Sequence, residues 1–216
     1  MRPIKGKGCL IVLRGTFAPQ IFQPAWFGTK GLIRQAESDK AKDIIVHESM
    51  TSFSLEWANV QVLQDRFTIA TMDEGYEEPM RDLVLSTFRL LSETPITAIG
   101  LNRTMHFQVE DVDTWHAIGH KLAPKEVLWD KILTSPGTKS LTIEGKHKSG
   151  LPGYTLVKIE PSVAYQNSVY AEINDHYIVG ESGKGTGADM AKLLEDTWAD
   201  SQLNSNTIMS SIRERL

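Results

Sequence analysis

The residues best suited to form a binding site lie in an alternating segment near the end of the chain. Between residues 168 and 179, apolar residues alternate with the polar or amphipathic side chains of Tyr170, Glu172, Asn174 and His176. Successive side chains of a β-strand point to opposite faces of its sheet, so these four would share one face. The pattern predicts a strand whose polar face binds a ligand or a partner, with a merely hydrated face as the alternative.

Other polar residues in strand-like segments are candidates for the same face. They are His47, Glu48, Gln61, Arg103 and His106. Histidines and carboxylates that converge on a concave pocket would suit a small-ligand sensor or an enzyme. A broad and flatter face with an apolar centre would instead favour binding to another protein.

A second group of candidates consists of two histidines with metal-ligand spacing. His116 and His120 are four residues apart in a segment that we predict to be helical, which would place them on one helix face. The acidic residue of a zinc hydrolase is absent between them, and no third ligand lies nearby. We therefore expect two surface histidines, and we predict no metal ion and no cofactor.

Motifs for phosphate binding and nucleophilic catalysis are absent or incomplete. In the glycine-rich segment 180–187, Gly185 occupies the position of the P-loop hydroxyl, so we expect a connector with Thr186 or Asp189 capping the next helix. The sequence contains no Gly-x-Ser-x-Gly motif, and Cys9 lies in an apolar run where packing is its expected role. We predict no catalytic residue and favour a non-enzymatic role.

Length and composition indicate an ordinary globular chain. The 216 residues are 41% hydrophobic and 23% charged, with a net charge of −4, which argues against a disordered or collagen-like protein. No apolar run reaches the roughly 20 residues of a membrane span, and no signal-peptide core is present at the N-terminus. A single cysteine agrees with a reducing compartment. We expect a cytoplasmic protein without membrane contact.

The charge distribution disfavours nucleic-acid binding. Both halves of the chain are slightly acidic, whereas binding to phosphates usually needs a basic surface. One locally basic stretch surrounds a predicted hairpin and contains Lys139, Lys146, His147, Lys148 and Lys158. We interpret it as a solvated turn, and nucleic acid stays a weaker alternative partner.

The elements that must position these residues follow a similar order in two halves, residues 1–94 and 95–216. In the first half we predict a strand at 9–13, a helical turn at 24–27, three strands within 44–57, 60–62 and 67–69, and a helix at 78–92. In the second half we predict a strand at 96–109, helices at 112–122 and 125–133, strands at 140–146, 154–159 and 168–179, and a helix at 188–216.

This repeated order predicts an internal duplication. A short local match between residues 13–16 and 101–104 supports it. Two units of one strand, a helix, three strands and a helix, paired edge to edge, would form one curved antiparallel sheet with helices on one face. The predicted fold class is therefore α+β, with both halves in one structural domain.

The repeated order resembles the saddle-shaped architecture of the TATA-box-binding protein. Segments 13–17, 82–88 and 174–177 also look like an uncharacterised family of bacterial proteins found sporadically among genomes. The resemblance implies a bacterial protein and no known activity. Carrying DNA binding across would require intercalating aromatic residues with basic neighbours, which the charge balance disfavours.

Together these observations favour a non-enzymatic cytoplasmic bacterial protein that binds a protein partner or a second copy through the open face of its sheet. The long last helix would offer Trp198 and Ile208 as apolar surface for self-association. The alternative is a sensor or enzyme that holds a small ligand through His47, His106, Glu172 and His176.

Overall fold

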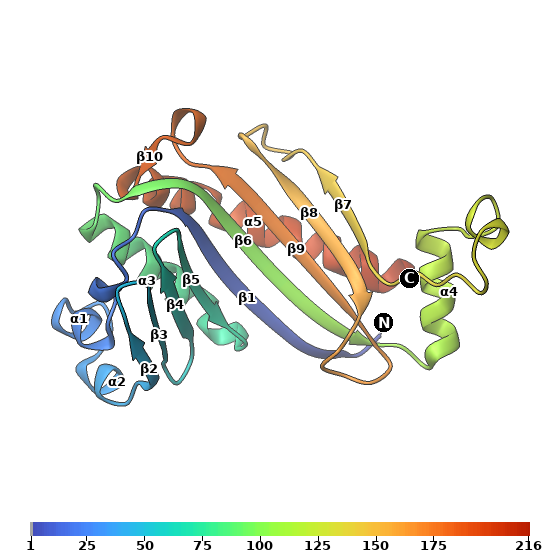
Figure 1. The fold of residues 1–216 in the computed structure, drawn as a ribbon, viewed down its shortest axis with the longest axis horizontal. Coiled ribbons are helices and arrows are strands. Elements are labelled where there is room, and N and C mark those ends of the chain that lie inside the picture. Colours follow the sequence, from blue (N-terminus) through green and yellow to red (C-terminus); the bar gives the residue numbers. More distant parts are fainter. Residues whose placement is uncertain (1) are drawn as a thin grey trace.

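The computed structural model describes residues 2–216 and contains one antiparallel sheet with helices packed against it (Figure 1). The strands are β1 (Ile4–Gly15), β2 (Lys42–Val46), β3 (Met50–Ser54), β4 (Asn59–Leu63), β5 (Arg66–Thr71), β6 (Pro95–Gln108), β7 (Leu141–Gly145), β8 (Gly153–Pro161), β9 (Ser168–Ile178) and β10 (Gly185–Thr186). The α-helices are α1 (Pro24–Thr29), α2 (Gln35–Asp39), α3 (Glu77–Leu90), α4 (Val112–Leu122) and α5 (Gly187–Arg215). Short 3-10 helices are η1 (Pro19–Ile21), η2 (Glu74–Tyr76), η3 (Trp129–Lys131) and η4 (Glu181–Gly183).

The two longest strands pair at the centre of the sheet. The order is β2-β3-β4-β5-β1-β6-β9-β8-β7, and β10 adds a short pairing to the end of β6. The β1–β6 pairing runs from Ile4 opposite Phe107 to Gly15 opposite Ile96, so the boundary between the halves is the middle of one sheet. The predicted α+β class and the single curved, unclosed antiparallel sheet are confirmed.

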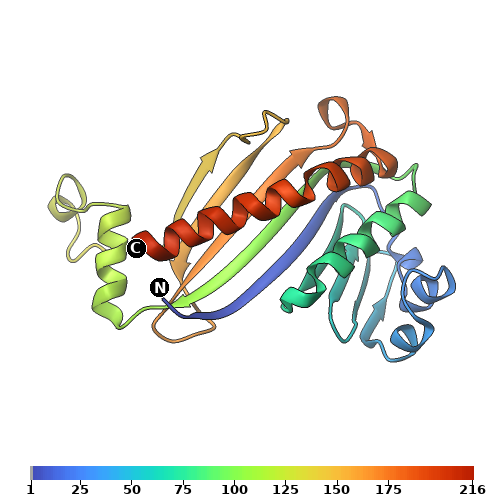
Figure 2. The ribbon, with the colours of Figure 1, turned by 180° about the vertical axis from the view of Figure 1, so that it is seen from behind.

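The helices α3 and α5 cover the same face of this sheet (Figure 2). On α3, the residues three and four apart that the sequence predicted as a core stripe are buried, including Met80, Leu83, Val84 and Phe88. The 29-residue α5 runs obliquely across β6 and β9 and presents Met190, Leu194 and Trp198 to the core. Trp198 is buried, so the prediction that it forms an exposed docking surface is wrong.

A polar layer divides the buried core on the helix side into two apolar clusters. The larger cluster includes Leu101 of β6, Tyr177 of β9 and Trp198 of α5. Further along the same three elements, the smaller cluster includes Met105, Ile173 and Met209. The polar layer lies between these two clusters, where the same three elements also point inward. It consists of four buried residues: Arg103, Asp175, Ser201 and Ser205.

Two predicted elements differ from the structure. The segment 44–57 is not one strand, because the chain turns at residues 47–49 and folds back as the β2–β3 hairpin. The segment 125–133 is not an α-helix and contains only the 3-10 turn η3. Helix α4 ends at Leu122, and the N–H of Ala123 donates the last helical hydrogen bond, to the carbonyl of Gly119. Pro124 has no N–H, so the helix cannot continue through it.

Candidate functional site

The face of the sheet opposite α3 and α5, called here the open face, carries most of the predicted site residues. On β9, Tyr170, Glu172, Asn174 and His176 alternate with buried residues and are each half-buried. The register places Tyr170 beside His106 of β6 and Glu160 of β8. The sequence-based prediction of this alternation is therefore confirmed.

Aromatic rings on the open face are held by neighbouring rings. The imidazole of His176 stacks on Tyr154 of β8, with ring centroids 4.6 Å apart and planes at 15°. His106 contacts both Tyr165 and Tyr170 at centroid distances of 5.1 and 5.0 Å. Its Nδ1 also lies 2.9 Å from the Ser162 hydroxyl. These contacts fix the orientation of the rings.

Burial changes the acid–base properties of these rings. It lowers the pKa of His106, because partial desolvation penalises the charged imidazolium. It also lowers the pKa of His176, with smaller contributions from His147 and Arg14. Burial raises the pKa of Tyr170, and the Glu172 carboxylate, which accepts a 3.0 Å hydrogen bond from the Tyr170 hydroxyl, raises it further. The open face therefore favours neutral histidine and tyrosine side chains.

Two apolar side chains lie in the middle of the open face, with Asn102 of β6 beside Leu10 and Thr68 of β5 beside Val12. Leu10 and Val12 of β1 lie there half-buried, with Ala70 of β5 opposite Leu10 and Gly100 of β6 opposite Val12. We call these four residues the apolar centre. Across β6, Gly100 lies beside His176 of β9, which is paired with Tyr154 of β8, whereas Tyr170 lies further along the strand beside His106. The apolar centre is therefore small and has polar and aromatic neighbours.

Three of the predicted residues lie away from β9. Gln61 lies on the open face in β4, opposite Ser52 and Thr68, on the other side of the apolar centre. His47 and Glu48 lie in the exposed β2–β3 turn rather than on a strand. About five strand spacings, roughly 24 Å, separate that turn from β9, so His47 does not converge with His176.

Arg103 was predicted on the open face and lies on the opposite face, so that prediction is wrong. It pairs with Ile173 across β6 and β9, and both side chains point toward α5. The neighbouring odd-numbered residues Leu101 and Met105 are buried under α5, and strand periodicity requires Arg103 to follow them.

The two histidines of α4 lie at the surface of the protein. His116 is exposed, and His120 contacts the Glu126 carboxylate at 2.5 Å. Among residues 2–216, no three His, Cys, Asp or Glu side chains are grouped so that they could hold a metal ion. The expectation of surface histidines agrees with this placement.

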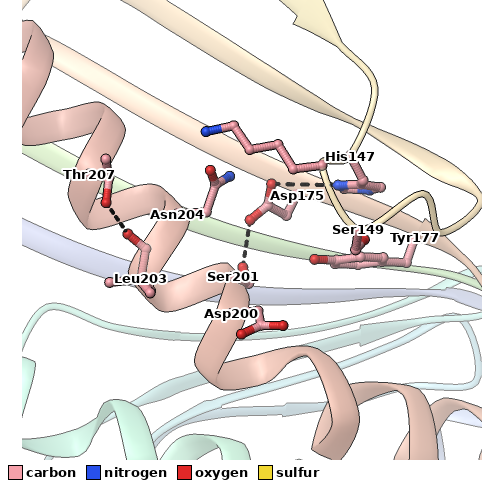
Figure 3. A pocket seen from close by; sticks show the side chains of 10 residues that line it. His147, Ser149, Asp175, Tyr177, Asp200, Ser201, Leu203, Asn204 and Thr207 are labelled. Carbon is pink, nitrogen blue, oxygen red and sulfur yellow. Dashed lines mark hydrogen bonds and ion pairs between the residues drawn. The ribbon is translucent and has the colours of Figure 1, made fainter.

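A buried hydrogen-bond network on the helix side was not predicted (Figure 3). Asp175 of β9 accepts one hydrogen bond at each carboxylate oxygen, from the hydroxyls of Thr155 and Ser201, both at 2.6 Å. Ser201 in turn accepts a 3.0 Å hydrogen bond from Nη1 of Arg103. The network joins the sheet to the middle of α5 through the polar layer.

His147 joins the other end of this network, although we expected it in a solvated turn. Its Nε2 lies 2.8 Å from the carbonyl oxygen of His176, and its Nδ1 lies 3.2 Å from the Thr155 hydroxyl. The imidazole also stacks on Tyr177, with ring centroids 4.2 Å apart. His147 is 8% exposed, so the β7–β8 loop is anchored by a buried side chain rather than free in solvent.

A pocket of about 380 Å³ lies beside this network, between α5 and the β7–β8 loop (Figure 3). Its lining includes Asp175, Tyr177, Asp200 and Asn204. The serine, histidine and aspartate here do not form a hydrolase triad, because Asp175 lies between the other two and Ser201 donates its proton to a carboxylate. Ser201 is also 1% exposed, and its hydroxyl is engaged with Asp175 and Arg103.

Two smaller predictions agree with the structure. The glycine-rich segment ends in a capping box, in which Thr186 accepts from the backbone N–H of Asp189 and the Asp189 carboxylate accepts from the Thr186 backbone. Cys9 is buried in the larger apolar cluster, and burial raises the pKa of its thiol to about 12. A thiol with that pKa is a poor nucleophile.

Comparisons with models of known protein families and with curated proteins find no match to this chain. None of the helices in the described part of the chain has the length and hydropathy that a membrane span requires.

Proposed function

We propose that the protein is a non-catalytic binding module that docks a protein surface on its open face. The observation that carries the proposal is the apolar centre with the stacked Tyr154–His176 pair beside it. Protein interfaces commonly have an apolar middle, a polar rim and an enrichment in tyrosine. Tyr154 stacks on His176, and Tyr170 contacts the tilted ring of His106, so little side-chain entropy would be lost when a partner binds.

A small-ligand sensor or enzyme has less support. It would need His47, His106, Glu172 and His176 around one pocket, but the first lies in a remote turn. Their neighbours on the open face are engaged in side-by-side contacts such as the 2.9 Å Lys158–Glu160 ion pair. This arrangement resembles a surface more than a pocket.

The proposal also includes an internal duplication, a bacterial source and a cytoplasmic location for the protein. The two halves would derive from one duplicated unit, since in each half the first strand is innermost and the others follow in reverse chain order, β1-β5-β4-β3-β2 and β6-β9-β8-β7. The resemblance to sporadic bacterial proteins supports a bacterial source. The unpaired, buried Cys9 supports a reducing cytoplasm.

The proposal is tested by placing a charge in the apolar centre. A photo-crosslinking amino acid at position 170 should trap a protein in cells, and Val12→Glu should abolish that product. The same amino acid at position 203, an exposed residue of α5 on the helix side, should trap nothing. Sedimentation velocity of the purified chain would then distinguish a second copy, seen as a concentration-dependent dimer, from a different protein.

Two results would contradict the proposal. One is an equal yield of crosslinked product from positions 170 and 203. The other is a product from position 170 that persists in the Val12→Glu variant, once circular dichroism has shown that this variant is folded.

A further inference from the structure

We propose that a crevice between α5 and the start of α3 binds a small oxyanion, a carboxylate or a phosphate, through the side-on edge of Arg103. The crevice has a volume of about 140 Å³. Its lining residues include Arg103, Lys7, Glu74, Glu77, Gln202 and Asn206. It lies on the helix side of the sheet, so this inference goes beyond the function proposed for the open face.

The guanidinium of Arg103 is positioned by contacts from α5. Its Nη1 donates a 3.0 Å hydrogen bond to the Ser201 hydroxyl, which is fixed in turn by Asp175. Its Cζ lies 4.7 Å from the centroid of the Trp198 ring, in a cation–π contact. The Arg103 side chain is only 5% exposed. The group is therefore rigid before any ligand arrives, which favours binding.

The remaining edge of this guanidinium lacks hydrogen-bond partners. Both Nε and Nη2 of Arg103 are buried, and neither makes a hydrogen bond within the described part of the chain. These two N–H groups are parallel and match the spacing of two oxygens in a carboxylate or phosphate. Buried charged donors are costly to leave without hydrogen bonds, and the Glu77 carboxylate supplies Nε only with an ion pair at 3.6 Å, so the edge can still donate to an acceptor. An anion in the crevice would supply it.

Two glutamates in the lining limit which ligand can bind. The Glu77 carboxylate lies 3.6 Å from Nε of Arg103, beyond hydrogen-bond distance, and accepts a 3.4 Å hydrogen bond from Gln202. Glu74 is paired with Lys7 at 2.9 Å. The charges of the two acidic and two basic side chains in the lining cancel. An incoming anion would therefore be attracted by Arg103 and repelled by Glu77. The small volume restricts the ligand to a few heavy atoms.

The test uses calorimetric titration of the intact chain with inorganic phosphate and, separately, with acetate at constant ionic strength. Saturable binding of one equivalent is expected, and the two titrations identify which anion class is preferred. Glu77→Gln should tighten binding about tenfold by removing the like charge. Arg103→Lys keeps the charge but loses the parallel edge, and should weaken binding about tenfold or more.

Two further variants keep the test decisive. Arg89→Lys alters an exposed arginine that is paired with Glu195, and should bind as the unmodified protein does. If Arg103→Lys fails to fold, Asn206→Ala changes an exposed lining residue, leaves Arg103 in place and should weaken binding several-fold. The proposal is overturned if neither the unmodified protein nor Glu77→Gln binds either anion saturably. It is equally overturned if folded Arg103→Lys binds as tightly as the unmodified protein. Neither result bears on docking at the open face.

Discussion

Asp175 and Ser201 are joined by a 2.6 Å hydrogen bond that ties the middle of β9 to the middle of α5. Both residues are 1% exposed, so this contact is made without competition from bulk water. Thr155 and Arg103 extend it toward β8 and β6. The position of the long helix over the sheet therefore depends on polar contacts as well as on apolar packing.

Removing the carboxylate at position 175 should destabilise the protein. We expect Asp175→Ala to lower the free energy of unfolding by about 3 kcal/mol, because it takes the shared acceptor from the buried hydroxyls of Thr155 and Ser201. Urea unfolding measures the difference. Asp196→Ala, on the exposed side of α5 with a surface pair to Lys192, should cost less than about 1 kcal/mol. Equal losses in the two variants would show that the network does not stabilise the fold.

The aromatic packing in the larger cluster gives a second prediction. Phe88 is fully buried and contacts the rings of Phe17, Phe22 and Phe67 at centroid distances of 6.0, 6.2 and 5.3 Å. Phe88→Ala should therefore cost roughly 3–5 kcal/mol, through lost burial and the cavity left behind. Leu90→Ala, at a half-exposed position of the same helix, is the control and should change stability little. A small effect of Phe88→Ala in the same unfolding assay would mean that the cavity collapses.

Two glycines near the β7–β8 loop provide a matched pair of backbone variants. Gly153 has a φ of 138°, and a Cβ there would overlap the carbonyl oxygen of His176, the group that contacts His147. Gly150 has a φ of 75°, and a Cβ there would meet no neighbour. Gly150→Ala should therefore cost about 1–2 kcal/mol from the left-handed backbone alone. Gly153→Ala should cost clearly more in thermal or urea unfolding, and a reversed order would contradict the placement of His147.

Stability should fall as the pH is lowered below about 6.5. The pKa values of His106 and His176 lie below the ordinary value of 6.5, so the unfolded chain binds more protons than the folded protein in that window. Their contribution is present above 6.5 and is lost as the pH falls through the folded pKa values. The double variant His106→Gln, His176→Gln should flatten the dependence of the unfolding midpoint between pH 7.5 and 5.5, values chosen to bracket the histidine range. The exposed His116→Gln should not flatten it.

The architecture could be predicted where one side chain pattern dominates a segment. The alternation in β9 and the apolar spacing in α3 place their buried faces correctly, and the bounds of α4 agree with the predicted 112–122. In contrast, the turn at His47 was missed because the polar residues 47–49 that follow the apolar run 44–46 include no glycine or proline. The turn propensities of these residues were too weak to divide segment 44–57 into two strands.

The buried network was missed because polar residues were expected on the wet face. Arg103 follows the parity of Leu101 and Met105, a signal that was present in the sequence but outweighed by its charge. On α5, the apolar stripe weakens at Ser201 and Ser205, where the helix faces Arg103 and Asp175. Polar residues interrupt the apolar faces of β6, β9 and α5. Which of them contact one another depends on how the strands and the helix pair, and one sequence does not reveal that pairing. The burial of His147 was also missed, because its neighbours Lys146 and Lys148 indicated a solvated turn.

The polar layer also separates two apolar clusters, which we expect to unfold at different free energies. The smaller cluster packs the later turns of α5 against the ends of β6 and β9, with Ile159 of β8 and Ile118 of α4, and shares no buried residue with the larger cluster. We therefore expect those turns to detach while the larger cluster stays packed. Amide hydrogens near Met209 would then exchange with deuterium through partial opening, whereas those near Leu194 would require global unfolding. The last helix is continuous in its backbone, and we expect its two ends to open independently.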